Sequence, residues 1–174
     1  MSAIDDALKA NDNYARTFNS GGLTMPPAKK LAVVACMDAR LTIEPMLGLK
    51  TGEAHIIRNA GGIVTEDALR SLIISEQLLG TGEIIIINHT DCGMLTFKDH
   101  ELEQKLKEQT GVTPIAPTRF FAFSDLEENV REQIGKLQLH PWIPKSIAIR
   151  GFVYDVKTGK LHEVSTVAEA RNAA

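Results

Sequence analysis

Two short, almost purely apolar segments constrain the fold of this chain more than any other feature. Residues 31–36 read LAVVAC, and four consecutive isoleucines stand within residues 83–89. Segments of this length without alternating polar residues are typical of strands buried on both faces, as in parallel sheets. A third strand is expected over residues 54–58, after the turn at Thr51 and Gly52. The sequence therefore predicts a buried, mainly parallel sheet.

Helices are expected between and around these strands. Thr65 is a suitable N-cap for a helix that Gly80 ends. Ser124 and Glu127 form a predicted capping box for a later helix, which ends near Leu139. Apolar or charged residues at helical spacing predict two further helices, over residues 3–19 and 102–108.

The chain is expected to close with a strand and a short hairpin. Residues 146–155 predict the strand, and KTGK at 157–160 predicts a turn into a hairpin that ends near Val164. Strands that alternate with helices predict an α/β fold. We expect a mostly parallel central β-sheet, flanked by helices and followed by this C-terminal hairpin.

The length favours one domain. The chain has 174 residues and a mass of 19.0 kDa, enough for a single packed core. We expect a single domain over residues 1–174, in which residues 1–25 form a helical arm. The breaks at Gly21 and Gly22 suggest that this arm packs on another subunit.

Charge and composition exclude several classes of protein. The net charge is −3 and the pI about 6.0, so we expect no nucleic-acid partner. No segment approaches the roughly 18 apolar residues of a membrane span, so we expect no membrane association. Asp5, Asp6 and Lys9 interrupt the apolar region that a signal peptide needs, which predicts a cytoplasmic protein. The two cysteines are then better candidates for metal ligands or catalytic groups than for a disulfide.

Both cysteines and one histidine stand at the carboxyl ends of predicted strands. Cys36 ends the first strand, and His89 and Cys92 follow the third. In α/β proteins this edge of the sheet carries the functional site. Two thiolates and one imidazole form a typical zinc set, and three protein ligands leave the fourth position open, as in catalytic zinc sites. Asp38 is the nearest candidate for a closing ligand.

An acidic and a basic residue lie close to the first predicted ligand. Asp38 and Arg40 are two residues apart, so their side chains point the same way in an extended segment. The functional interpretation is that Arg40 keeps Asp38 ionised and off the metal. The alternative is a surface ion pair, which is worth little. Arg58 is expected to pair with a carboxylate near the site. A phosphatase-like use of Cys36 and Arg40 is the weaker interpretation, since their spacing is too short.

Three motifs carry a resemblance to a known family. ACMDAR at 35–40, RNAGG at 58–62 and HTDCGM at 89–94 resemble the β-class carbonic anhydrases, most closely the small archaeal and mycobacterial branch. RGFVYDVKTGKLHEV at 150–164 is similar to the final strand and hairpin of that family. The resemblance implies zinc bound by Cys36, His89 and Cys92, with Asp38 and Arg40 as a catalytic dyad. It also implies a homodimer, often paired into a homotetramer, with active sites at subunit interfaces.

The predicted reaction is the reversible hydration of carbon dioxide to bicarbonate and a proton. Zinc-bound hydroxide, oriented by the Asp–Arg dyad, is expected to attack the carbon. Backbone N–H groups at Gly61, Gly62 or Gly93 are candidates for holding the substrate oxygen. Two alternatives stay open: hydrolysis of carbonyl sulfide or carbon disulfide on the same fold, and a non-catalytic zinc-binding module.

Overall fold

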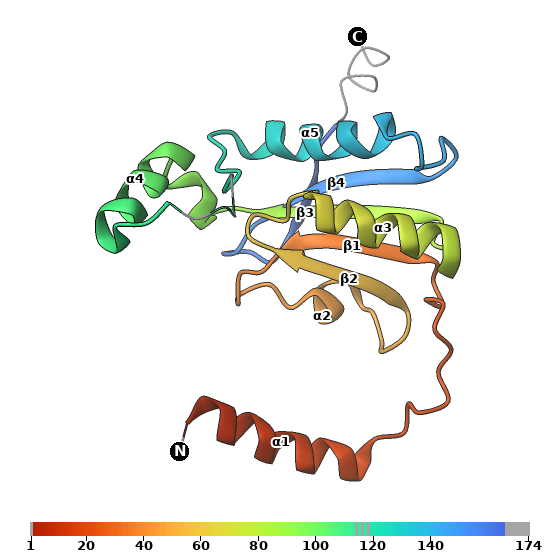
Figure 1. Cartoon of the computed structure of the whole chain (residues 1–174). Helices are drawn as coiled ribbons and strands as arrows, with labels where there is room; N and C mark the ends of the chain where they lie inside the picture. Colours follow the sequence, from red (N-terminus) through yellow and green to blue (C-terminus); the bar gives the residue numbers. More distant parts are fainter. Residues whose placement is uncertain (1, 114, 116, 118, 166–174) are drawn as a thin grey trace.

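The apolar segments form the centre of one five-stranded sheet with the strand order β2-β1-β3-β4-β5. This arrangement comes from a computed structural model that describes residues 2–113, 115, 117 and 119–165 (Figure 1). The first four strands in this order pair in parallel, and β5 pairs antiparallel with β4. The strands span β1 Leu31–Cys36, β2 Ala54–Asn59, β3 Glu83–His89, β4 Ala148–Tyr154 and β5 Leu161–Glu163. The predicted fold class is therefore confirmed, hairpin included.

The predicted domain range extends slightly beyond these residues. The predicted range of 1–174 includes residue 1 and residues 166–174, and these lie outside the described residues.

Five α-helices and one 3₁₀ turn accompany the sheet in the described residues. They are α1 Ala3–Thr17, α2 Ile43–Leu47, α3 Glu66–Leu79, the 3₁₀ turn Gly93–Leu95, α4 Asp99–Thr110 and α5 Leu126–Leu139. The short α2 and the 3₁₀ turn were not expected. The caps of α3 are as predicted, because the Thr65 hydroxyl accepts from the Ala68 N–H and Gly80 ends the helix at a φ of 74°.

The predicted capping box at the start of α5 is wrong. Asp125, not Ser124, is the N-cap, and its carboxylate accepts from the N–H of Glu128 at 2.8 Å. A carboxylate at this position satisfies a free N–H and also interacts favourably with the helix dipole. Asp125 therefore starts α5 one residue later than the Ser124–Glu127 spacing suggested.

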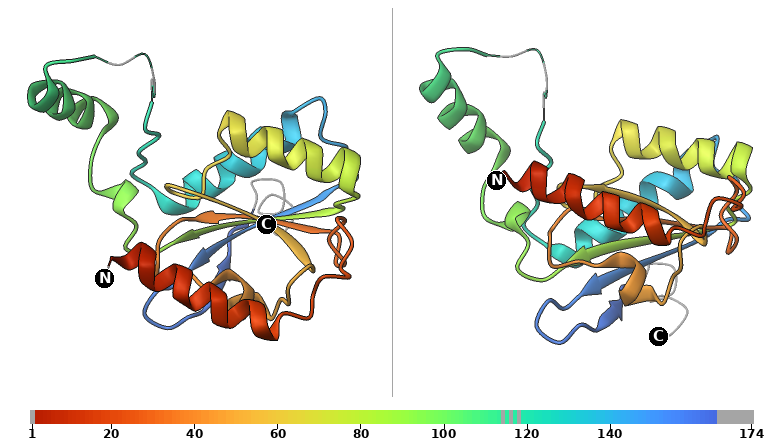
Figure 2. Two further views of the ribbon diagram at one scale, coloured as in Figure 1. Left: turned by 60° about the horizontal axis from the view of Figure 1, so that its bottom comes forward. Right: turned by 90° about the horizontal axis from the view of Figure 1, so that it is seen from below.

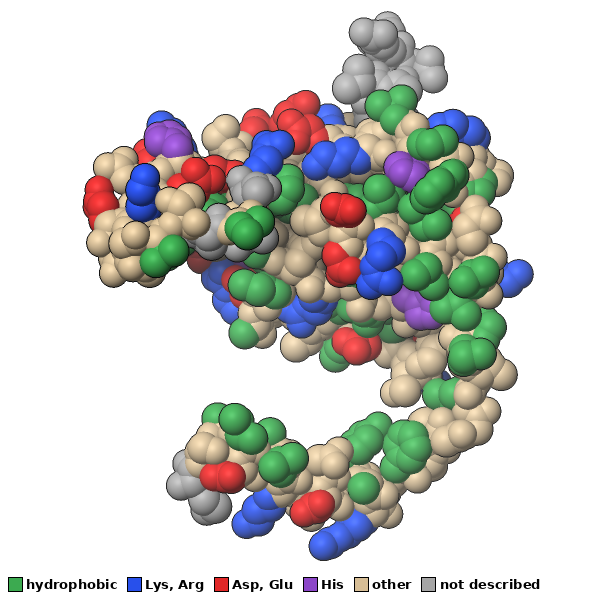
Figure 3. Space-filling model, viewed as in Figure 1, with side chains coloured by type: hydrophobic (Ala, Val, Ile, Leu, Met, Phe, Trp, Pro, Cys, Tyr) green, Lys and Arg blue, Asp and Glu red, His purple; other side chains and the backbone are tan. Residues whose placement is uncertain are grey.

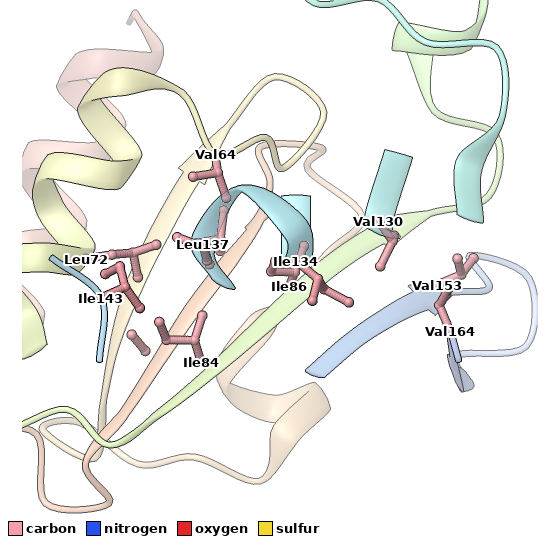
Figure 4. Close-up of a cluster of buried hydrophobic side chains, with 12 residues drawn as sticks. Val64, Leu72, Ile84, Ile86, Val130, Ile134, Leu137, Ile143, Val153 and Val164 are labelled. Carbon is pink, nitrogen blue, oxygen red and sulfur yellow. The ribbon is translucent and has the colours of Figure 1, made fainter. Parts of the chain in front are cut away.

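Each face of the sheet carries its own apolar cluster. On one face, α3 and α5 cover the sheet, and Leu72, Ile134 and Leu137 pack against Ile84 and Ile86 of β3 (Figure 4). The other face carries a second cluster that includes residues of α2 and of the loops after β1 and β3. Burial on both faces explains why β1 consists entirely of apolar residues up to Cys36.

Helix α1 stands away from the sheet in Figure 1, and in the two turned views of Figure 2 it lies in front of the rest of the molecule. None of its residues is buried, and Ile4 and Leu8 are 72% and 63% exposed. Hydrophobic side chains gather on the side of α1 that is turned toward the rest of the molecule (Figure 3). Among the described residues, no helix is both long and apolar enough to cross a membrane.

Strand register brings the predicted ligands to one edge. β1 and β3 are parallel neighbours, and Ala35 lies opposite Ile87. Cys36 therefore ends β1 at the same edge at which His89 ends β3. Parallel pairing without a register slip is what places these two side chains together.

Substitution of Gly151 in β4 tests how closely α5 packs on the sheet. A Cβ at Gly151 would lie 2.3 Å from Cγ1 of the buried Val130, so α5 packs directly on the bare backbone there. We expect Gly151→Ala to lower the free energy of unfolding by about 1–3 kcal/mol, because overpacking a rigid contact is costly. Chemical denaturation measures this.

The matched control is Gly135→Ala within α5. No atom lies within 4 Å of the Cβ it would add. We expect Gly135→Ala to raise the free energy of unfolding by up to about 1 kcal/mol through helix propensity. Equal effects of the two substitutions would contradict this account of the α5–β4 contact.

Candidate metal centre

Three ligand-type side chains converge at the carboxyl edge of β1 and β3. Cys36 Sγ, Cys92 Sγ and a ring nitrogen of His89 all lie within 4.8 Å of one another. All three residues are buried, and both cysteines are free thiols. Cysteine sulfur and histidine nitrogen are the ligands that zinc prefers in proteins. The structure therefore brings together the three residues that the sequence predicted as a metal set.

A tight turn after β3 returns the chain to the site. Asp91 has a φ of 56°, an uncommon value that aspartate tolerates better than most residues. Thr90 holds the turn in place, since its N–H donates to the Tyr154 carbonyl at 2.9 Å and its hydroxyl accepts from the Val156 N–H at 3.1 Å. Cys92 is thereby placed beside His89.

The imidazole of His89 is oriented for metal binding. Nδ1 lies 2.9 Å from the Thr90 carbonyl, which only accepts, so Nδ1 carries a proton and donates it. In the neutral ring this leaves a lone pair on Nε2. Nε2 is buried and has no hydrogen-bond partner, although such atoms are normally paired. A buried lone pair beside two thiols is the donor set that zinc prefers, so these residues fit a bound zinc ion.

The surroundings of the cysteines favour one thiolate. The Cys92 thiol, His89 and the N–H groups of Asp38 and Gly61 lower the pKa of Cys36, against the effect of burial. The pKa of Cys92 is raised, first by Cys36 and then by burial. The pair therefore holds one negative charge easily and a second only with added positive charge. A divalent cation supplies that charge.

Asp38 and Arg40 form a two-pronged ion pair next to the three ligands. Arg40 Nε lies 2.9 Å from Asp38 Oδ1, and Arg40 Nη2 lies 2.8 Å from Oδ2. These hydrogen bonds hold the pKa of Asp38 well below its usual range, so the carboxylate stays ionised. Asp38 Oδ2 is 3.8 Å from His89 Nε2. The carboxylate therefore stands at the edge of the ligand set.

Arg40 has a second acidic partner that the sequence did not reveal. Its Nη1 lies 2.7 Å from Asp91 Oδ2, and its Nη2 donates to the Asp91 carbonyl at 3.0 Å. Arg40 therefore bridges the loop after β1 to the turn after β3. Since the two acids are far apart in sequence, only the position of Asp91 between two predicted ligands could have signalled this contact.

Arg58 does not have the predicted role. Its guanidinium donates to the carbonyls of Cys36 at 3.0 Å and of Asp38 at 2.7 Å, and among the described residues it forms no ion pair with a carboxylate. Arg58 thus holds the backbone of the loop that carries Cys36 and Asp38.

Gly61 and Gly62 form a tight turn against Cys36. Their φ values are 84° and 63°, and a Cβ at Gly62 would lie 2.8 Å from the backbone nitrogen of Cys36. The Gly62 N–H donates to the Asn59 carbonyl at 3.2 Å, and the Gly61 N–H is one of the groups that lower the pKa of Cys36. The N–H groups of Gly61, Gly62 and Gly93 stay predictions as donors to substrate.

Asn88 is a residue near the site that the sequence analysis passed over. It is buried, it precedes His89, and its side-chain amide donates to the Gly61 carbonyl at 2.8 Å. The available signal was a lone amide residue directly after four consecutive isoleucines, since such groups are buried only when hydrogen-bonded.

The chain is similar to known proteins over almost its whole length. A family profile described as carbonic anhydrase matches residues 31–161. The chain is 50% identical to β-carbonic anhydrase 1 of Mycobacterium tuberculosis, over 95% of this chain and 99% of that protein. The crystal structure of a carbonic anhydrase from Streptococcus mutans superposes with a TM-score of 0.89 at 47% identity, covering 95% of this chain and 99% of that one. A carbon disulfide hydrolase of Saccharolobus solfataricus is 36% identical, over 92% of this chain and 88% of that protein.

Substitution of a sulfur ligand tests the metal site. We expect Cys92→Ser to weaken zinc binding by more than about 100-fold, because losing even an outer contact of a metal site costs roughly 10–100-fold. Competition with a chromogenic chelator measures the affinity. The control is His162→Ala, which removes an exposed imidazole from β5 and should leave zinc affinity unchanged. Equal zinc affinities of Cys92→Ser and the unsubstituted protein would contradict the assignment.

Proposed function

The chain belongs to the β-carbonic anhydrase family, and from that premise we propose how its own residues take part in the reaction. The enzyme is a zinc-dependent carbonic anhydrase, which interconverts carbon dioxide and water with bicarbonate and a proton. The observation that carries the residue assignment is the unpartnered Nε2 of His89, buried beside two thiols and next to the Asp38–Arg40 pair.

Cys36, His89 and Cys92 are the proposed zinc ligands. When bound, zinc acidifies a water molecule and so supplies hydroxide near neutral pH. The N–H groups of Asp38 and Gly61 stabilise the thiolate of Cys36, and the N–H of Met94 does so for Cys92. The Thr90 carbonyl fixes the His89 ring with its Nε2 toward the sulfur atoms.

Asp38 is the proposed orienting group. Its carboxylate accepts a hydrogen bond from the nucleophilic oxygen, which aims a lone pair of that oxygen at the carbon of carbon dioxide. This role requires an ionised acceptor in a fixed position. Arg40 meets both requirements, since it binds both oxygens of Asp38 and is itself held by Asp91.

Gly93 is the proposed substrate contact. A Cβ at this residue would meet no atom within 4 Å, so there is open space beside its backbone. Gly93 follows Cys92 directly and begins the 3₁₀ turn Gly93–Leu95. Its N–H is a candidate donor to an oxygen of carbon dioxide or bicarbonate.

The sulfur analogues of carbon dioxide are the second candidate substrates. The relative from Saccharolobus solfataricus, named a carbon disulfide hydrolase, is 36% identical to the chain. The 50% identity to a carbonic anhydrase favours carbon dioxide. Incubating the zinc-loaded protein with carbon disulfide or carbonyl sulfide and measuring hydrogen sulfide release tests the alternative.

A homodimer, with pairing into a homotetramer as a further step, is the proposed assembly. Residues 1–25 act as an arm that packs on a second copy, because the apolar side chains of α1 make no buried contact within their own chain. The sheet face beside α2 supports the same proposal, since Ile85, Tyr154 and Leu161 are only partly buried there.

The cytoplasm is the proposed location. Its support is that both cysteines are free thiols in a metal-type cluster, which a reducing compartment preserves.

Removal of the orienting carboxylate tests the mechanism. We expect Asp38→Ala to bind zinc like the unsubstituted protein but to lose about 100-fold or more in kcat/KM for carbon dioxide hydration, since the nucleophile is no longer oriented. Stopped-flow hydration with a pH indicator measures the rate. Asp67→Ala, which breaks an exposed ion pair with Arg70, is the control. Full activity of Asp38→Ala would remove Asp38 from the mechanism.

Charge placed on the apolar face of α1 tests the assembly. We expect Leu8→Asp to shift the protein toward monomers, because the charge would have to be buried against the second copy. Light scattering after gel filtration measures the mass. Lys9→Asp, on the adjoining polar side of the helix, should keep the dimer. An unchanged mass for Leu8→Asp would count against the arm.

A further inference from the structure

Three buried side-chain amides connect the metal centre to the surface of α5. Asn88 lies on β3, and Asn129 and Gln133 lie one turn apart on α5. They are 1%, 4% and 1% exposed. Amides are costly to bury beside an apolar cluster unless they are fully paired.

The three amides are hydrogen-bonded in series. Gln133 Nε2 donates to Asn129 Oδ1 at 2.9 Å, and Asn129 Nδ2 donates to Asn88 Oδ1 at 2.6 Å. Asn88 Nδ2 donates to the carbonyl of Gly61 at 2.8 Å and to that of Gly62 at 3.3 Å. Each amide thus accepts on its outer side and donates on its inner side.

The groups at the two ends of the series can only donate or only accept hydrogen bonds, and they fix its direction. At the outer end, Gln133 Oε1 accepts from the Val64 N–H at 3.0 Å and from Lys136 Nζ at 2.9 Å, and both of these only donate. At the inner end, the Gly61 and Gly62 carbonyls only accept. With both ends fixed, none of the amides can flip without losing a bond, and the aligned dipoles reinforce one another.

The inner end of the series holds the turn that contacts Cys36. A Cβ at Gly62 would lie 2.8 Å from the backbone nitrogen of Cys36 and 3.0 Å from the carbonyl carbon of Ala35, so the turn packs directly on the end of β1. A small movement of this turn would therefore shift the strand end that carries the Cys36 sulfur. The outer end, at Lys136, lies on the exposed side of α5.

We propose that Asn88, Asn129 and Gln133 are positioning residues of the metal centre, which hold the Gly61–Gly62 turn against the backbone of Cys36 and so fix the position of its sulfur. This inference rests on the proposed role of Cys36 as a zinc ligand. The competing account is that the amides only fasten α5 to the sheet. In that case their loss would affect stability and leave the metal centre unchanged.

Gln133→Glu breaks the series at a single atom. The new carboxylate still accepts from the Val64 N–H and the Lys136 ammonium, which keeps it ionised, but it cannot donate to Asn129. Asn129→Asp removes the donor to Asn88 in the same way. This second variant replaces Gln133→Glu in the test if Gln133→Glu does not fold. The matched control is Gln138→Glu, an exposed position of α5.

The readout is the cobalt-substituted protein, because thiolate-to-cobalt charge-transfer absorption reports on the sulfur ligands directly. We expect Gln133→Glu to shift this band, since its energy depends on how the Cys36 sulfur is placed at the metal and the Gly61–Gly62 turn packs against the Cys36 backbone. We also expect zinc affinity to fall about tenfold, as for other outer contacts of metal sites. Gln138→Glu should keep the band and the affinity of the unsubstituted protein.

Two results would overturn the proposal, and they are distinguishable. If the unsubstituted protein shows the band and folded Gln133→Glu or Asn129→Asp keeps it, with unchanged zinc affinity, the amides are only structural. If the unsubstituted protein has no thiolate-to-cobalt band, the ligand assignment of Cys36 fails, and this proposal fails with it.

Discussion

The parallel pairing of β1 with β3 is the constraint on which the rest of the structure depends. It brings the carboxyl ends of two buried strands side by side, so Cys36 and His89 meet at one edge without any help from the loops. The tight turn at Asp91 then needs to return only Cys92 to complete the set. Because both strands are buried on both faces, the set is rigid and largely shielded from water.

Charge balance governs what this edge can hold. Two sulfur atoms in a buried setting accept one negative charge readily and the second only beside a cation. The carboxylate of Asp38 adds a further negative charge close by, and Arg40 compensates it with two direct hydrogen bonds. Cys36, His89 and Cys92 are therefore available to bind a metal ion, while Asp38 stays ionised beside them. Arg40 can hold this position because Asp91 binds it from the other side.

The sequence predicted the features that follow from local patterns, such as a strand and the residues at its end. It predicted poorly the contacts that depend on packing between distant segments. The strands, the candidate ligands and the Asp38–Arg40 pair could be predicted because each follows from local patterns. The N-cap at Asp125 was missed because two adjacent residues suit that position and the helix geometry decides between them. The Asn88 amide series and the Asp91 contact could not be predicted, because their partners come together only when α5 and the loops are in place.

The central claim is that the buried cluster and its carboxylate together make a hydration catalyst. Stopped-flow measurement of carbon dioxide hydration by zinc-loaded protein, from about pH 6.5 to 9, tests it most directly. We expect fast turnover that increases with pH, because hydroxide is the nucleophile and Asp38 is already ionised throughout this range. Absence of hydration at every pH, with zinc confirmed in the protein, would contradict the claim.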